Sequence, residues 1–320
     1  MESASDESIA YKVMRTVWVP WQRERRLVRE QERTLAATRR SAWLGAGYQH
    51  AVVLRRDGGV ACWGMNEDGQ APPEGVDGDF IATSAGWSHS IALRRNGNVA
   101  CWGRNDDGRA PPDGVEGDFV AIAAGGEHSL ALRRNGNVAC WGDNGSGQAP
   151  PDGVDGDFVA IAAGGYHSLA LRRNGSVACW GFTVHGQAPP DGVEGDFVAI
   201  AAGRFHSLAL RRDGNVACWG YNNQGQAPPD GVEGDFVAIA AGGEHHSIAL
   251  RRDGGIACWG SNDEGQAPPG GVDGDFVAIS AGVHFSVALR RDGSVACWGY
   301  NNRGQAPADG VHGPFKTQEV

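Results

Sequence analysis

Cysteine and histidine, residue types that serve as nucleophiles, general bases and metal ligands, recur at regular intervals along this chain of 320 residues. Each of the seven cysteines is followed by tryptophan: Cys62, Cys101, Cys140, Cys179, Cys218, Cys258 and Cys297. Six histidines recur in step with them: His50, His89, His128, His167, His206 and His246. The chain has no Cys-x-x-Cys or His-Glu-x-x-His spacing for a metal, no phosphate-cradling glycine motif and no Gly-x-Ser-x-Gly nucleophile turn. We therefore expect no metal, no cofactor and no enzyme activity.

These residues recur because the chain itself is a repeat. Successive Cys-Trp pairs are 39, 39, 39, 39, 40 and 39 residues apart, which defines seven units: 41–79, 80–118, 119–157, 158–196, 197–235, 236–275 and 276–314. The first unit departs from the others at its start, and the sixth is one residue longer at His245-His246. A fixed period of about 40 residues is typical of propellers and other repeat architectures.

Each unit predicts three short antiparallel strands, as the fourth shows. Phe158 to Ala163 is apolar and ends at glycine, His167 to Leu171 alternates large and small residues, and Val177 to Trp180 is a third strand. Asn174-Gly175 between the last two is a preferred pair for a two-residue hairpin turn, in which both residues take positive φ. Residues 181–196 are loop-like, with room for a short outer strand.

The strands must position the recurring residues by packing one unit against the next. A single sheet cannot bury both its faces, so neighbouring units must cover them. We predict an all-β fold, a seven-bladed β-propeller over residues 41–320, in preference to an open solenoid or a large barrel. The repeated tryptophans are then packing residues, the cysteines buried thiols too far apart to pair, and the histidines structural hydrogen-bonding groups. An enzyme built from residues around the central channel is the alternative.

Variation between units is confined to two turns, one after the first strand and one after the third. Antiparallel order brings both turns to the same face of the ring. We predict a protein-binding surface there, because aromatic residues and arginine provide most interface hot spots. Its candidate residues are Tyr48, Trp87, Glu127, Tyr166, Phe182, His185, Arg204, Phe205, Tyr221 and Tyr300.

Acidic residues flank this aromatic sector, which favours a partner with a basic or mixed surface. They are Asp106, Asp107, Glu127, Asp143, Glu244, Asp263 and Glu264. Drift at exposed loop tips is the alternative explanation. The opposite face carries seven Arg-Arg pairs beside acidic connections, so we expect mutual ion pairs there, with an anion-binding surface as the alternative. Its carboxylates lack the spacing of a calcium-binding loop.

Composition narrows the function classes. There are 50 Gly and 15 Pro, and hydrophobic residues make up 41% of the chain, which fits many short strands joined by tight turns. Residues 41–320 hold 19 Lys and Arg against 32 Asp and Glu, so nucleic-acid binding is not expected. No apolar run is long enough for a membrane span, and no secretory signal precedes the repeats, so we expect an intracellular protein, cytoplasmic or nuclear.

Residues 1–40 form a separate, charged extension with nine Lys and Arg against six Asp and Glu. Pro20 begins a predicted helix on which Trp21, Val28 and Leu35 recur every seven residues. We expect a solvated, partly mobile helix, with docking of this thin apolar stripe on the propeller or on a partner as the alternative.

The repeat resembles that of the regulator of chromosome condensation family. The resemblance rests on Gly-Gly-Tyr166-His167-Ser-Leu-Ala-Leu, Asn174-Gly, Val-Ala-Cys-Trp180-Gly and Gly186-Gln187, and it extends over residues 41–314. The departures are Ala51 for Ser, Phe285 for His, Arg109 for Gln and Thr183 for Asn. The compact units are also similar to those of the bacterial propeller that inhibits β-lactamases.

The resemblance implies a seven-bladed propeller. In the sequence, either 41–47 or 315–320 is a candidate for completing the ring, and 41–47 has the better strand pattern. Family members include a nucleotide-exchange factor for the small GTPase Ran, domains of ubiquitin ligases, an ultraviolet receptor and protein inhibitors. The even spacing leaves no room for a wedge-like insertion of the kind the exchange factor carries. We therefore expect a non-catalytic adaptor or inhibitor-like protein, with guanine-nucleotide exchange or chromatin-associated regulation of a small GTPase as the alternative.

Overall fold

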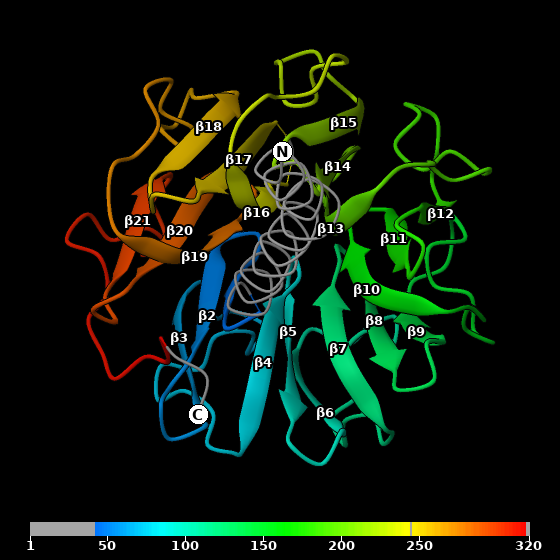
Figure 1. The fold of residues 1–320 in the computed structure, drawn as a ribbon. Helices are drawn as coiled ribbons and strands as arrows, with labels where there is room; N and C mark the ends of the chain where they lie inside the picture. Colours follow the sequence, from blue (N-terminus) through cyan, green and yellow to red (C-terminus); the bar gives the residue numbers. More distant parts are fainter. Residues whose placement is uncertain (1–41, 244, 318–320) are drawn as a thin grey trace, which may run out of the picture.

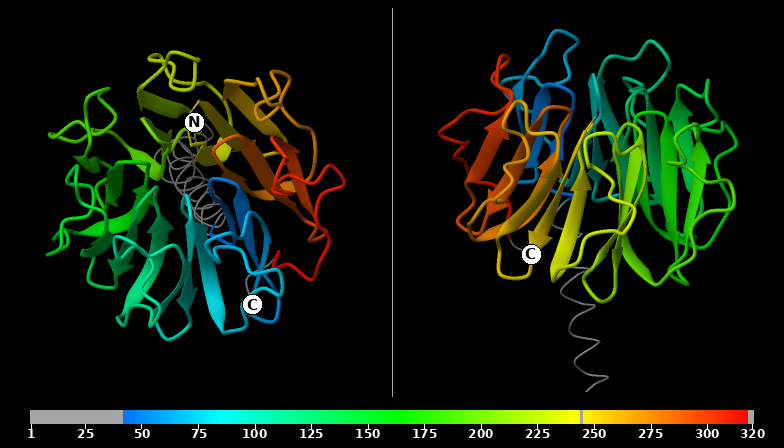
Figure 2. Two further views of the ribbon diagram at one scale, coloured as in Figure 1. Left: turned by 180° about the vertical axis from the view of Figure 1, so that it is seen from behind. Right: turned by 90° about the horizontal axis from the view of Figure 1, so that it is seen from above.

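The structure is a ring of seven sheets around a central axis (Figure 1). The computed structural model describes residues 42–243 and 245–317, so the helix expected within residues 1–40 lies outside the described residues. Each sheet has three antiparallel strands in chain order, which confirms the predicted all-β, seven-bladed propeller. Seen from the side, the strands run between two faces that are both covered by loops (Figure 2).

The strands of the first four sheets are β1 (Leu44–Ala46), β2 (His50–Leu54), β3 (Val60–Gly64), β4 (Phe80–Ala85), β5 (His89–Arg94), β6 (Val99–Gly103), β7 (Phe119–Ala124), β8 (His128–Arg133), β9 (Val138–Gly142), β10 (Phe158–Ala163), β11 (His167–Arg172) and β12 (Val177–Gly181). Those of the last three sheets are β13 (Phe197–Ala202), β14 (His206–Arg211), β15 (Val216–Gly220), β16 (Phe236–Ala241), β17 (His246–Arg251), β18 (Ile256–Gly260), β19 (Phe276–Ala281), β20 (Phe285–Arg290) and β21 (Val295–Gly299).

The first strand of each sheet lines the central axis and the middle strand is the most buried. In the fourth sheet, β11 is buried over its first five residues, because both of its faces pack against neighbouring sheets. A bulge between Phe158 and Ala160 interrupts the pairing of β10 with β11. The outer strand that residues 181–196 could hold is reduced to a single bridge between Val177 and Val193.

The hairpin turn between the second and third strands differs from the prediction. Gly175 alone has positive φ, at 92°, and no described residue other than glycine takes a positive φ. The Gly175 amide donates to the Arg172 carbonyl (3.0 Å) and the Arg172 amide to the Ser176 carbonyl (2.8 Å). These bonds define a three-residue loop with a glycine bulge, so only one position needs positive φ. Asn174 instead accepts the Ser176 amide on its side-chain oxygen (2.9 Å), as Asn does in tight turns.

Both ends of the described chain contribute to closing the ring. β1 supplies the innermost strand of the first sheet. Phe315 pairs with Arg55, the residue that directly follows β2. The Arg56 amide donates to the Pro314 carbonyl (2.8 Å), and the Phe315 side chain is 2% exposed. Phe315 thereby supplies the aromatic residue that begins the first strand of every other sheet and that the first unit lacks.

A repeated hydrogen-bond relay joins neighbouring sheets. The fully buried imidazole of His50 lies 2.9 Å, Nε2 to Oγ, from Ser90 of the next sheet, and the Ser90 hydroxyl donates to the Gln70 carbonyl (2.9 Å). The indole of Trp102 donates to the same carbonyl (3.0 Å). Because the serine hydrogen is used in this way, the imidazole must be the donor of the first bond. The predicted hydrogen-bonding role of the histidines is therefore confirmed. The tryptophans are half-buried and pack against the hydrophobic clusters, for example Trp63 and Trp102 in the first and Trp141 in another, which confirms their packing role.

Candidate protein-binding surface

The two variable turns of each unit meet on one face of the ring. In the fourth unit the Phe182 amide donates to the Tyr166 carbonyl (2.9 Å), and in the fifth the Tyr221 amide donates to the Phe205 carbonyl (2.8 Å). The Tyr300 amide likewise donates to the His284 carbonyl (2.9 Å) in the seventh. These bonds fix the residue after Trp-Gly beside the pair after Ala-Gly, as antiparallel order predicted.

Aromatic side chains on this face form one connected group, which we call the aromatic cluster. Its rings lie 5.0–6.4 Å apart, centroid to centroid, mostly in edge-to-face contact. This is the range in which aromatic pairs attract one another. The members are Trp87, Tyr166, Phe182, His185, Phe205, Tyr221 and His245.

Trp87 reaches the cluster from two units away. Its ring lies 5.3 Å from that of Tyr166, although the third unit separates them in the chain. A Cβ atom on Gly126 would lie 2.9 Å from the Trp87 indole, closer than real contacts allow. The glycine of the third unit therefore leaves the space in which the indole lies.

Arg204 is held among three rings of the cluster. Its guanidinium carbon lies 5.2 Å from the centroid of Trp87, 5.7 Å from that of Tyr166 and 4.9 Å from that of Phe205. Each cation–π contact of this kind contributes about 0.5–2 kcal/mol. A Cβ atom on Gly165 would lie 2.8 Å from the Arg204 side chain, so this glycine also makes room. The aromatic cluster is thus fixed in place around a charge.

Three candidate residues lie outside the cluster. Tyr48 is 40% exposed and takes part in none of the ring contacts found among the described residues. Glu127 approaches Arg109 instead (3.6 Å). Tyr300 contacts His284 at a centroid distance of 6.3 Å, as a separate pair in the seventh unit.

His245 belongs to the cluster, and the sequence-based list of candidates omitted it. Its ring lies 5.9 Å from that of Tyr221. The feature of the sequence that could have indicated it is the extra residue of the sixth unit, which places a second histidine directly before His246.

Several of the acidic residues in the flanking sectors form ion pairs or hydrogen bonds with neighbouring residues. Asp106 pairs with Arg104 (2.5 Å), and Asp107 pairs with Arg109. Asp143 accepts the side-chain amide of Gln148 (2.6 Å). Glu244 lies outside the described residues.

Arginine side chains on the opposite face of the ring make two kinds of contact. The first arginine of most pairs stacks on the phenylalanine that begins the innermost strand, for example Arg94 on Phe80 at 4.8 Å. The second forms ion pairs in three units, among them Arg212 with Asp196 (2.9 Å). The expected mutual ion pairs are present, so much of this arginine charge has structural partners.

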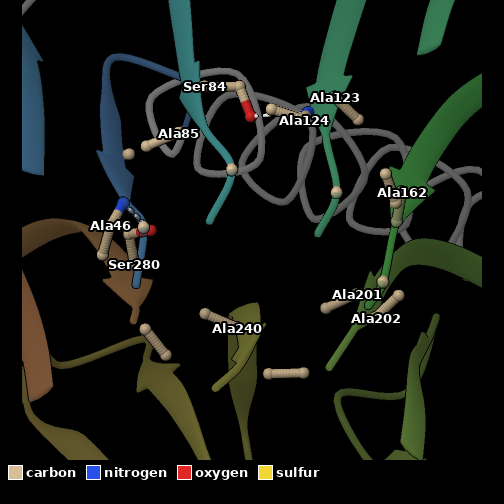
Figure 3. A pocket seen from close by; sticks show the side chains of 18 of the residues that line it. Ala46, Ser84, Ala85, Ala123, Ala124, Ala162, Ala201, Ala202, Ala240 and Ser280 are labelled. Atoms are coloured by element: carbon tan, nitrogen blue, oxygen red, sulfur yellow. Dashed lines mark hydrogen bonds between the residues drawn. The ribbon is translucent and has the colours of Figure 1, made fainter. Parts of the chain in front are cut away.

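A cavity of about 250 Å³ runs along the axis between the innermost strands (Figure 3). Alanine, glycine and isoleucine make up most of its lining, and Ser84 and Ser280 accept the amides of Ala124 and Ala46 (both 3.0 Å). Trp87 and Arg204 also line it, so it approaches the aromatic cluster. Among the lining residues described, Arg204 alone has an ionisable side chain.

The recurring thiols and imidazoles are poorly suited to acid–base or nucleophilic work. Four of the seven cysteines are buried as predicted, whereas Cys140, Cys179 and Cys258 are half-buried. Burial raises the pKa of the Cys179 thiol to about 12 and lowers the pKa of the His167 imidazole to about 3. Both groups are therefore neutral near pH 7. Within residues 42–243 and 245–317, no three His, Cys, Asp or Glu side chains gather as a metal site, and no helix could span a membrane.

Comparison with known proteins identifies the repeat. The model of the regulator of chromosome condensation (RCC1) repeat matches seven times, at residues 44–70, 80–109, 119–148, 158–187, 197–226, 236–266 and 276–305. No curated protein matches the sequence.

Solved structures share the propeller fold at low sequence identity. The ectodomain of the receptor kinase ACR4 from Arabidopsis thaliana is 24% identical, with a TM-score of 0.67 over 83% of this chain and 98% of that one. The ectodomain of the receptor kinase CR4 from Physcomitrella patens is 25% identical, with a TM-score of 0.64 over 80% and 72%. Prp20p from Saccharomyces cerevisiae is 22% identical, with a TM-score of 0.62 over 77% and 81%. With seven matched repeats, the chain belongs to the regulator of chromosome condensation (RCC1) repeat family.

Proposed function

We propose that this chain is a non-catalytic, protein-binding propeller, an adaptor or an inhibitor-like module, and that it binds its partner through the aromatic cluster. The observation that carries the proposal is the connected set of rings around Arg204, on a scaffold whose other positions hardly vary between units. Aromatic residues and arginine dominate the binding energy of protein interfaces.

The packing of the cluster supports this role. Ring-to-ring contacts and Arg204 restrict the side chains before a partner arrives, so little conformational entropy remains to be lost on binding. The glycines beneath Trp87 and Arg204 leave the space that these side chains fill, which favours selection for the cluster over drift at loop tips.

The remaining chemistry supports a non-catalytic role. Apart from Arg204, the axial cavity is lined by uncharged residues. The recurring imidazoles are buried, the thiols are buried or half-buried, and both kinds of group are neutral near pH 7. The acidic excess of residues 41–320 favours protein over nucleic acid as the partner. We expect the protein to act inside the cell, in the cytoplasm or the nucleus.

The test is crosslinking mass spectrometry of pulldowns with the intact chain and with a variant in which Tyr166, Phe182, Phe205 and Tyr221 are replaced by alanine. Circular dichroism and thermal unfolding establish that the variant is folded. A protein captured by the intact chain and lost with the folded variant is the expected result. Equal capture by both would rule out the aromatic cluster as the binding surface.

Regulation of a small GTPase or of chromatin is the second candidate, because Prp20p, which shares the repeat, is described as binding Gsp1p and histones. In this chain the seven units have nearly equal length, without an inserted wedge. Release of labelled GDP from a panel of purified small GTPases tests exchange activity. Acceleration by the intact chain would support this candidate, and unchanged rates across the panel would remove it.

A further inference from the structure

The loop that follows β12 differs from its six counterparts. It reads Phe182-Thr183-Val184-His185, and Val184 is at its tip. The residues at the same place in the other units are polar or glycine: Glu67, Asp106, Gly145, Asn223, Asp263 and Asn302. The fourth unit alone presents a branched apolar side chain there.

Val184 is the most exposed large apolar side chain among the described residues, with 75% of its surface accessible. His185 directly after it and Phe182 two residues before it both have rings in the aromatic cluster. The valine therefore projects into solvent from a base of packed rings. Exposure of an apolar side chain at such a place contributes nothing to the stability of the fold.

Hydrogen bonds brace the loop across its tip and at its C-terminal end. The Gly186 amide donates to the Thr183 carbonyl (2.8 Å), and Gly186 takes a positive φ of 76°. The His185 amide donates to the side-chain carbonyl of Gln187 (3.0 Å), which is fully buried. A projecting side chain on a fixed loop can enter a pocket with little loss of conformational entropy.

We propose that Val184 inserts into an apolar pocket on the partner protein, so that this chain supplies the projecting residue and the partner supplies the cleft. The inference rests on the proposed binding role of the aromatic cluster, whose rings would contact the rim of that cleft. The tips on either side, Gly145 and Asn223, carry no charge, which fits a pocket with an uncharged rim.

The experiment compares full-length variants binding to the protein that the intact chain captures, with affinities measured by calorimetry. V184A removes two methyl groups and should weaken binding about tenfold, since about 1.4 kcal/mol corresponds to a factor of ten. V184D would bring a charge into the pocket and should weaken binding about a hundredfold or more. N302D adds the same charge at the equivalent tip of the seventh unit, outside the aromatic cluster, and as the matched control it should stay within about twofold.

A photoreactive diazirine side chain in place of Val184 identifies what the tip touches. Crosslinks to apolar residues inside a concave site of the partner are expected. Binding of V184D within threefold of the intact chain, while the quadruple alanine variant fails to bind, would overturn the insertion and leave the proposed function standing. Crosslinks confined to a flat or charged surface would do the same, and failure of the intact chain to capture any protein would overturn both.

Discussion

Phe285 and Ala51 face each other across the joint where the ring closes, at the two positions that histidine and serine hold at the other joints. At the preceding joint His246 Nε2 lies 3.0 Å from Ser286 Oγ. Phe285 and Ala51 are both fully buried and belong to one hydrophobic cluster. Two departures from the repeat thus form one compensated pair, because replacing both partners of a buried hydrogen bond by apolar groups can be nearly neutral.

Restoring the polar pair at this joint should show strong coupling between the two positions. F285H alone buries an imidazole with no hydroxyl to accept its proton, and should lower the free energy of unfolding by about 1–3 kcal/mol. The double variant F285H/A51S should recover about 1 kcal/mol relative to the sum of the single variants. Thermal unfolding followed by circular dichroism measures all four proteins, and additive effects would contradict the pairing.

The six buried histidines should make the fold unstable to acid. Burial lowers their pKa from 6.5 to about 3 or 4, for example to about 3 in His167 and about 4 in His50. Between pH 6.5 and the folded-state value, the unfolded chain binds a proton that the folded chain does not. Stability is therefore lost as the pH falls through this window, by about 1.4 kcal/mol per pH unit for each histidine.

A variant that copies the apolar pair of the closing joint isolates this effect from that of the carboxylates. H167F/S207A removes one of the six His–Ser pairs while leaving every acidic residue in place. Its loss of unfolding free energy between pH 7 and pH 5 should be about 2 kcal/mol smaller than that of the intact chain. Urea titrations at the two pH values measure the difference, and an equal loss in both proteins would refute the role of the histidines.

The sequence predicted the structural features that all seven units share. It was less informative about positions at which one unit differs from the others. Seven copies of the same strand pattern predicted the propeller, and antiparallel order predicted the face on which Tyr166 and Phe182 meet. The prediction of a two-residue turn at Asn174-Gly175 was wrong because two- and three-residue hairpin loops favour the same pair of residues. The contact between Trp87 and Tyr166 depends on the curvature of the ring and on the space left by Gly126, and neither can be seen in the spacing of the sequence.

Closure of the ring should depend on Phe315 as strongly as any other sheet depends on its own phenylalanine. The side chain is 2% exposed and packs in the largest hydrophobic cluster of the described residues. F315A should lower the free energy of unfolding by about 3–5 kcal/mol. K316A is the control: its ammonium lies 5.2 Å from the centroid of Trp43, and a contact of this kind at the surface contributes about 0.5–1 kcal/mol. Similar melting temperatures for the two variants would show that the C-terminal segment is dispensable for closure.

The arrangement of the aromatic cluster should depend on the absence of a side chain at Gly126. In G126A the new Cβ atom would lie 2.9 Å from the Trp87 indole and 2.7 Å from the Gly165 carbonyl oxygen, so the indole must move. With tryptophan replaced by 5-fluorotryptophan, the ¹⁹F resonance assigned through W87F should shift in G126A. Partner affinity should fall about tenfold if the ring contributes about 1.4 kcal/mol to binding.

Gly270 is the matched control, since no atom lies within 4 Å of a Cβ placed there. G270A should leave both the resonance and the affinity unchanged. An unshifted Trp87 resonance in G126A would mean that the glycine does not determine where the indole lies.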